Sequence, residues 1–152
     1  MQIQKQMKER ACAIVLSGDK LMFMKQEVNG KIHRVFVGGA IEDGETPEQA
    51  VLREINEEIN VDGHILFGPV VVEEFHNNHV FIVDIGNQTP TLGYDPELPP
   101  DKQDLKGIIW VDITDGNAVF NKVDMLFVSK ILKEAKIQGV SEPWVKKLEK
   151  CT

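Results

Sequence analysis

The sequence predicts an α/β protein in which a mixed β-sheet is covered by helices on both faces, an α/β sandwich. Two observations support this prediction. Segments with strand character surround two segments with helical periodicity, in the order strands, helix, strands, helix. The 152-residue chain with 42% hydrophobic residues can also build one proper core. We therefore expect residues 1–152 to form a single domain.

The first third of the chain has the pattern of short strands joined by turns. Residues 11–16, ACAIVL, and 21–25, LMFMK, flank the turn sequence SGDK. The Asn-Gly dipeptide at 29–30 predicts a second hairpin turn, because both residue types tolerate positive φ. RVFV at 34–37 predicts a further short strand that ends at two glycines.

A helix is predicted from the residue after Thr46 to about Asn60. Thr46 is a good N-cap, Pro47 suits the first helical position, and Gln49 completes a capping box. Asn60 suits the left-handed conformation that often ends a helix. Four apolar residues form one stripe that we expect to be buried: Val51, Leu52, Ile55 and Ile59.

The second half of the chain adds three strands and a helix. GPVVVEEF at 68–75 and HVFIVDI at 79–85 predict a β-hairpin that turns through the asparagines at 77–78. GIIWVDI at 107–113 predicts another strand, and the amphipathic pattern over 123–138 predicts a second helix.

A long segment between the last two strands, residues 86–106, has four prolines and little periodicity. Long loops in compact domains are usually functional or disordered. We expect this one to face a ligand and to govern substrate specificity, although a solvated loop would explain its polar residues as well.

Charge and cysteine content exclude some classes of protein. The chain has 17 basic and 24 acidic residues, a net charge of −7, and no Lys/Arg cluster, so long nucleic acids are not expected partners. Cys12 and Cys151 have no framework spacing and indicate free thiols. The sequence has no apolar run with a length of about 18 residues, so the chain is expected to be cytoplasmic and not membrane-bound. A homodimer is compatible with the sequence, which does not determine oligomeric state.

Acidic residues are concentrated in REINEE, residues 53–58. On a helix Glu54 and Glu58 are one turn apart and Glu57 lies beside them, so their carboxylates can converge. Such like charges repel unless a cation lies among them, and hard oxygen ligands suit Mg²⁺ or Mn²⁺. For the hexapeptide alone, a solvated helix face is the simpler interpretation.

The spacing around these acids resembles the Nudix box, G-x5-E-x7-R-E-U-x-E-E-x-G-U, where U is a bulky aliphatic residue. Gly39 begins the match and Val61 ends it, and Asn60 stands at the second glycine. Val37 stands where many relatives have proline. The flanking strands and the closing helix follow the order of the family's fold, so the resemblance implies a Nudix-type α/β/α sandwich.

The resemblance implies a Mg²⁺-dependent or Mn²⁺-dependent pyrophosphohydrolase that cleaves a nucleoside diphosphate linked to another moiety. Carried over by position, Glu57 and Glu58 would be the principal metal ligands, and Glu54 would be a further ligand or the general base. A backbone carbonyl near Gly38 and Gly39 would complete the metal coordination.

Two further box residues would organise these carboxylates. Arg53 would hold the glutamates in place through its guanidinium group, and Glu45 would close the preceding loop against them. The general base is not settled, because some relatives take it from the loop that corresponds to 86–106. Four acidic residues are available there: Asp95, Glu97, Asp101 and Asp104.

Two alternatives stay open at this point. A Nudix-fold module could bind or sense a nucleotide without cleaving it, although the joint presence of all three glutamates favours catalysis. The substrate could be a modified nucleoside triphosphate, a nucleotide sugar or a similar compound. ADP-ribose and dinucleoside polyphosphates are less favoured, because Phe75, His76 and Asn78 stand where the matching subfamilies have proline or tyrosine.

Other chemically active side chains have simpler structural explanations. His76 and His79 are close in sequence, but a hairpin turn accounts for them better than a metal site. Trp110 lies in a predicted strand, where a core position is more common than a base-stacking role.

Overall fold

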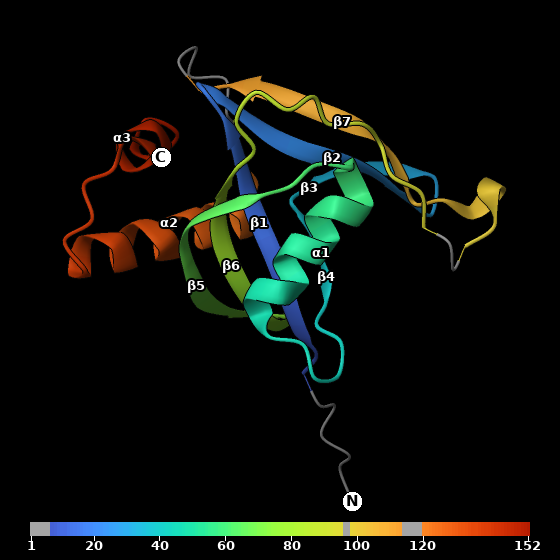
Figure 1. The fold of residues 1–152 in the computed structure, drawn as a ribbon, viewed down its shortest axis with the longest axis horizontal. Helices are drawn as coiled ribbons and strands as arrows, with labels where there is room; N and C mark the ends of the chain where they lie inside the picture. Colours follow the sequence, from blue (N-terminus) through green and yellow to red (C-terminus); the bar gives the residue numbers. More distant parts are fainter. Residues whose placement is uncertain (1–6, 96–97, 114–119) are drawn as a thin grey trace, which may run out of the picture.

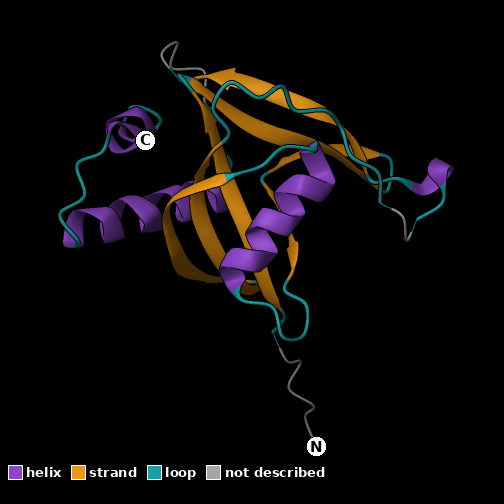
Figure 2. Ribbon diagram, in the orientation of Figure 1, coloured by secondary structure: helices purple, strands orange, loops and turns teal. Residues whose placement is uncertain are grey.

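A mixed β-sheet forms the centre of the molecule and helices cover both of its faces, which confirms the predicted fold class (Figures 1 and 2). The computed structural model describes residues 7–95, 98–113 and 120–152. The strands are β1 (Glu9–Ser17), β2 (Lys20–Val28), β3 (Lys31–Val35), β4 (Val37–Ala40), β5 (His64–Glu74), β6 (His76–Asp84) and β7 (Leu105–Asp112). The helices are α1 (Pro47–Ile59), α2 (Lys122–Ile137), α3 (Pro143–Glu149) and the short 3-10 helix η1 (Pro100–Lys102).

The sheet is mixed because β1 and β6 pair in parallel while the other pairs are antiparallel. Its strand order is β3-β2-β1-β6-β5, with β4 on β1 and β7 on β2. Two partners share one side of β1: β2 pairs with its end, at Val15–Ser17, and β4 pairs with its start, at Arg10–Ala13. This arrangement brings the glycine pair of β4 beside the central strand.

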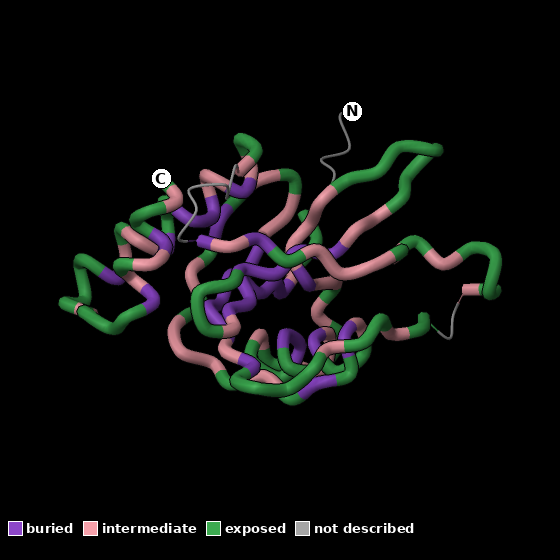
Figure 3. The backbone as a smooth tube through the Cα atoms, turned by 90° about the horizontal axis from the view of Figure 1, so that it is seen from above, coloured by how far each residue is buried: buried purple, intermediate pink, exposed green. Residues whose placement is uncertain are grey.

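Strand β1 is buried on both faces, and its side chains alternate between two hydrophobic cores. Ala11, Ala13 and Val15 belong to the core under α1. Cys12 and Ile14 belong to the core under α2 and α3. Because both faces are covered, ACAIVL has no polar alternation. Buried segments are accordingly concentrated at the centre of the molecule (Figure 3).

The predicted features of α1 are confirmed with one exception. The Thr46 side chain accepts a hydrogen bond from the Gln49 backbone, the capping box is complete, and Asn60 ends the helix with φ 57°. Val51, Ile55 and Ile59 are fully buried against the sheet. Leu52 is 37% exposed, so the prediction of a four-residue buried stripe was wrong at this position.

The β5–β6 hairpin does not turn where the sequence indicated. The turn lies at Phe75, which has φ 61°, and the asparagines at 77–78 belong to β6. Asn78 is buried, and its amide donates to the backbone oxygens of Val72, Glu74 and His76. Its hydrogen-bonding capacity therefore stabilises the end of the hairpin instead of forming the turn.

Three further details differ from the sequence-based expectations. The strand expected at 34–37 is divided at Phe36 into the end of β3 and the start of β4. Trp110 is 38% exposed on β7, so its predicted core position was wrong. Helix α3 was not predicted, and it buries Trp144 and Leu148. In the part of the chain that is described, no helix has the length and apolar character needed to cross a membrane.

Candidate active site

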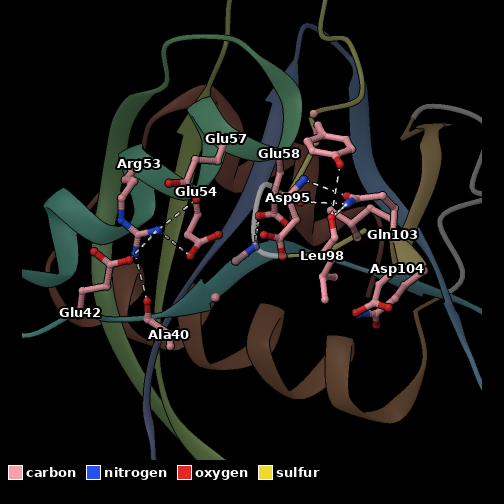
Figure 4. A pocket seen from close by; sticks show the side chains of 16 residues that line it. Ala40, Glu42, Arg53, Glu54, Glu57, Glu58, Asp95, Leu98, Gln103 and Asp104 are labelled. Atoms are coloured by element: carbon pink, nitrogen blue, oxygen red, sulfur yellow. Dashed lines mark hydrogen bonds and ion pairs between the residues drawn. The ribbon is translucent and has the colours of Figure 1, made fainter. Parts of the chain in front are cut away.

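The predicted site residues come together at one cleft of about 380 Å³ between α1, β4 and the loop that joins β6 to β7. Figure 4 shows side chains of α1 on one side and Gln103 and Asp104 of the loop on the other. Helix α1 contributes Arg53, Glu54, Glu57 and Glu58, and strand β4 contributes Gly38 and Gly39. Glu45 lies just outside, in contact with Arg53.

Arg53 is the centre of the hydrogen-bond network on this wall. Its Nη1 donates to Glu54 Oε1 at 3.0 Å and to Glu57 Oε2 at 3.2 Å, and its Nη2 donates to the Ala40 carbonyl at 3.1 Å. The remaining hydrogen bonds of the guanidinium go to Glu45. One planar cation therefore fixes α1, the end of β4 and the loop before the helix relative to one another.

Glu45 is held by two hydrogen bonds from the same guanidinium, at 2.7 Å and 2.9 Å, and by the backbone N–H of Glu42 at 3.0 Å. These donors lower the pKa of the Glu45 carboxyl to about 2, with the Arg53 hydrogen bonds as the main cause. Glu45 therefore stays ionised, and its contacts join the loop before α1 to Arg53 on the helix.

The glycine at position 39 has a steric reason. A Cβ atom at Gly39 would collide with the carboxylate of Glu54, so a larger residue there would displace that side chain from its place against β4. Space for a side chain is also missing at Gly38, because a Cβ there would lie 2.5 Å from the Ala11 carbonyl oxygen of β1.

Burial raises the pKa of Glu54, while the nearby Arg53 opposes this shift.

Glu58 lies deepest of the three glutamates. Its Oε2 accepts a hydrogen bond from the Gly38 backbone N–H at 3.0 Å. Burial, followed by the negative charge of Glu54, raises the pKa of the Glu58 carboxyl to about 8. A carboxylate placed there requires either a proton or a nearby cation at neutral pH.

Among the described residues, no three His, Cys, Asp or Glu side chains are close enough to form a ready-made metal site. Arg53 holds Glu54 and Glu57, and Gly38 holds Glu58. The donors are nevertheless of the right chemistry, because carboxylate oxygens are the ligands that Mg²⁺ and Mn²⁺ prefer. The raised pKa of Glu58 likewise fits a position where a cation would stabilise the charged form.

Six described residues of the loop between β6 and β7 line the cleft: Gly93, Tyr94, Asp95, Leu98, Gln103 and Asp104. Asp95 and Asp104 are among its lining residues, whereas Asp101 on η1 is not. Glu97, the fourth acidic candidate, lies outside the described residues. Sequence reasoning missed Gln103, whose amide donates to the carbonyls of Asp95 and Leu98 and whose oxygen accepts from the Asp95 backbone. Nothing in the local pattern distinguished it from a solvated glutamine.

The two histidines near the β5–β6 hairpin make separate contacts. His79 Nε2 lies 3.0 Å from Glu9 Oε2, across the parallel pair of β6 and β1. The Nδ1 atom of His76 is buried without a hydrogen-bond partner among the described residues. Both histidines lie in β6 and not in the hairpin turn at Phe75, so the turn that the sequence indicated does not account for them.

Comparisons with known proteins give the same family. The NUDIX domain model matches residues 7–126, which is most of the chain. An 8-oxo-dGTP diphosphatase of Proteus vulgaris is 46% identical over 46 residues, which are 30% of this chain and 41% of that protein. The match therefore spans less than half the length of this relative.

Solved structures share the fold at low sequence identity. A MutT Nudix hydrolase from Burkholderia pseudomallei matches with a TM-score of 0.62 and 16% identity, over 84% of this chain and 99% of that one. A Nudix-family hydrolase from Clostridium perfringens matches with a TM-score of 0.60 and 15% identity, over 88% and 99%. The chain belongs to the Nudix hydrolase family, whose members act on phosphoric anhydrides. Members of this family generally use divalent metal ions.

Proposed function

We propose that this protein is a Mg²⁺-dependent pyrophosphohydrolase that cleaves a nucleoside diphosphate linked to another moiety. The observation that carries the proposal is the set of three glutamates that α1 places at the wall of a cleft. Arg53 holds two of them, Glu54 and Glu57, and the Gly38 N–H holds Glu58. A binding module needs no such concentration of carboxylates, whereas metal-assisted phosphoryl chemistry depends on it.

Each residue of the network has a role in this proposal. Glu57 and Glu58 would hold the metal ion, with Glu54 as a further ligand and a backbone carbonyl near Gly38 and Gly39 as the remaining protein ligand. The bound Mg²⁺ or Mn²⁺ would supply charge neutralisation of diphosphate oxygens and a lowered pKa for the attacking water.

Arg53 and Glu45 act through the other carboxylates. The guanidinium of Arg53 keeps Glu54 and Glu57 in fixed orientations, because planar donors restrict a carboxylate more than an ammonium does. Glu45 in turn orients the guanidinium through its paired hydrogen bonds.

The general base has three remaining candidates within the described residues. Glu54 has a raised pKa and lies against Gly39, and Asp95 and Asp104 line the opposite wall. A positioned base must reach the attacking water, so the pH–rate profile distinguishes the three. Glu54→Gln, Asp95→Asn and Asp104→Asn should be compared. The base is the residue whose variant no longer shows the increase of kcat with rising pH.

For the substrate, we favour a modified nucleoside triphosphate among the compounds that the family resemblance leaves open. The support is the name of the Proteus relative, an 8-oxo-dGTP diphosphatase, together with its 46% identity in the matched segment. We further propose a cytoplasmic enzyme with residues 1–152 as one domain. Size-exclusion chromatography with light scattering would show whether it forms a homodimer.

The proposal is tested with a panel of oxidised nucleoside triphosphates, nucleotide sugars and unmodified nucleotides, with and without Mg²⁺. Phosphate and pyrophosphate release and the nucleotide products are measured. Mg²⁺-dependent cleavage at the diphosphate is the expected result. If nucleotides raise the melting temperature but none is cleaved, the protein is a binding module and the proposal fails.

A further inference from the structure

Asn60 ends helix α1 at the place where the Nudix box has glycine, and its side chain makes contacts that glycine cannot make. Its backbone is left-handed, with φ 57° and ψ 37°, and its N–H donates to the Asn56 carbonyl at 3.0 Å. The side-chain amide donates to the Thr91 carbonyl at 3.2 Å and to Thr91 Oγ1 at 3.0 Å. Glycine would adopt this backbone conformation with less strain, so the particular contribution of asparagine is its contact with Thr91.

The backbone of the loop continues the same connection. Thr91 N–H donates to the Ile59 carbonyl at 3.0 Å, and Gly93 N–H donates to the Glu58 carbonyl at 2.7 Å. These are among the last carbonyls of α1, which have no partner within the helix. A Cβ atom at Gly93 would overlap the Glu57 carbonyl oxygen, so glycine is needed for this close approach. Residues 91–93 therefore cap the helix that carries the glutamates.

The far end of the loop is fixed to the other side of the cleft. The Asp104 carbonyl accepts a hydrogen bond from the Glu27 N–H of β2 at 2.9 Å. Between the two ends, Gln103 joins the Asp95 backbone to the Leu98 carbonyl. The described parts of the loop thus contact α1 at one end and β2 at the other, and the contact between Asn60 and Thr91 lies at the helix end (Figure 4 shows Asp95, Gln103 and the glutamates).

We propose that Asn60 is a positioning residue for substrate binding. It connects helix α1, which carries the glutamates, to the wall of the cleft that the loop forms. This inference rests on the proposed function, because it assigns the loop wall to the substrate. Asn60 contacts Thr91 and not the metal-ligand carboxylates, so its loss should affect the binding of the substrate more than the chemical step.

The test compares Asn60→Gly with Asn29→Gly. Both asparagines are left-handed, with φ 57° and 52°, but Asn29 lies in the turn between β2 and β3 and is not among the described residues that line the cleft. Asn60→Gly should raise KM on the best substrate by about threefold to tenfold, the effect expected for one or two hydrogen bonds, with kcat changed less than about twofold. Asn29→Gly should leave both constants unchanged.

Thr91→Val provides the second arm, because it removes the hydroxyl but keeps the backbone contacts. If the Thr91 hydroxyl acts through Asn60, the double variant Asn60→Gly/Thr91→Val should have the KM of Asn60→Gly alone. Additive increases in KM would show that the two residues act independently, and they would overturn the proposal. An unchanged KM in Asn60→Gly, or a loss confined to kcat, would overturn it too.

A readout without substrate separates this proposal from the proposed function. Tyr94 is the single tyrosine of the chain and follows Gly93, so 3-fluorotyrosine gives one ¹⁹F resonance from the loop wall. In Asn60→Gly this resonance should shift or broaden, and in Asn29→Gly it should stay as in the unaltered protein. If no nucleotide is cleaved but the resonance responds, the proposed function fails while the anchoring of the loop stands. An unchanged resonance in Asn60→Gly would show that Asn60 does not position the loop.

Discussion

Arg53 binds Glu45 through two parallel hydrogen bonds, from Nε to Oε2 at 2.7 Å and from Nη2 to Oε1 at 2.9 Å. The remaining guanidinium nitrogen, Nη1, holds Glu54 and Glu57. The paired contact therefore fixes the plane of the guanidinium, and this plane in turn fixes two carboxylates of the cleft.

Replacing Arg53 by lysine should lower kcat by about tenfold to a hundredfold, because a single ammonium cannot hold three carboxylates in fixed geometry. Glu45→Gln should produce part of the same loss. Steady-state kinetics of both single variants and the double variant form a cycle, in which the losses should be strongly non-additive. Independent, additive losses would mean that Glu45 does not act through Arg53.

Glu57→Gln and Glu58→Gln should each lower turnover by about 10²-fold to 10⁴-fold, the range expected when a positioned charge is removed. Both changes keep the size of the side chain, so folding can be verified by circular dichroism. Glu48→Gln is the matched control. It lies exposed in the first turn of α1, and its loss should cost only about a few tenths of a kcal/mol through the helix dipole. Equal activity in all three variants would show that REINEE is only a solvated helix face.

The metal-free protein should lose stability as the pH rises through the neutral range. The pKa of Glu58 is raised from 4.5 to about 8, so between these values the folded state binds more protons than the unfolded state. The free energy of unfolding therefore falls with rising pH in this window. Asp124 contributes in the same direction only up to about pH 6, because its pKa is raised from 3.8 to about 6 by burial.

Denaturant unfolding in chelator at several pH values between about 6 and 8 measures the contribution of Glu58 above the range of Asp124. Glu58→Gln should flatten the decline, whereas Glu48→Gln should not. Several millimolar Mg²⁺ should raise the melting temperature, because the metal ion would replace the proton of the Glu58 carboxyl. The increase should be largest at the highest pH of this range. A decline of equal slope in Glu58→Gln, or a melting temperature insensitive to Mg²⁺, would contradict this account.

Gln103→Ala should change the order of preference among substrates more than the turnover of the best one. The side chain joins Asp95 to Leu98 within the cleft wall, and its loss should alter individual KM values by about tenfold, as for two or three lost hydrogen bonds. Gln88→Ala is the control. Gln88 makes the same kind of bridge, to Asp62 and Ile85, but is not among the described residues of the cleft. If both variants keep the original order, the loop wall does not select the substrate.

Helix α1 could be predicted from the sequence because its signals are local. Thr46, Pro47 and Gln49 act within one turn, and the spacing of the box residues places them on one wall as soon as the helix forms. The left-handed end at Asn60 was predicted for the same reason. The roles of Arg53 and Glu45 were expected from the family resemblance, and the structure places both residues on or next to that helix, in contact with each other.

The remaining features depend on contacts between distant segments. Asn78 resembles a turn residue, but its amide is satisfied by three backbone carbonyls across the hairpin. Trp110 is exposed because β7 pairs with β2 outside the central order of strands, which one strand's composition does not reveal. The contacts of Asn60 and Gln103 depend on the path of the loop, and that path has no periodic signal in the sequence.

The alternating side chains of β1 have a consequence for cooperativity. Ala13 faces the core under α1, and its neighbour Ile14 faces the core under α2, so this strand cannot leave one core and stay in the other. The two layers should then unfold together, in a single transition seen equally by helix and sheet probes. The backbone amides of Ala11–Leu16 should exchange with solvent only through global unfolding, and they should be the slowest of the chain.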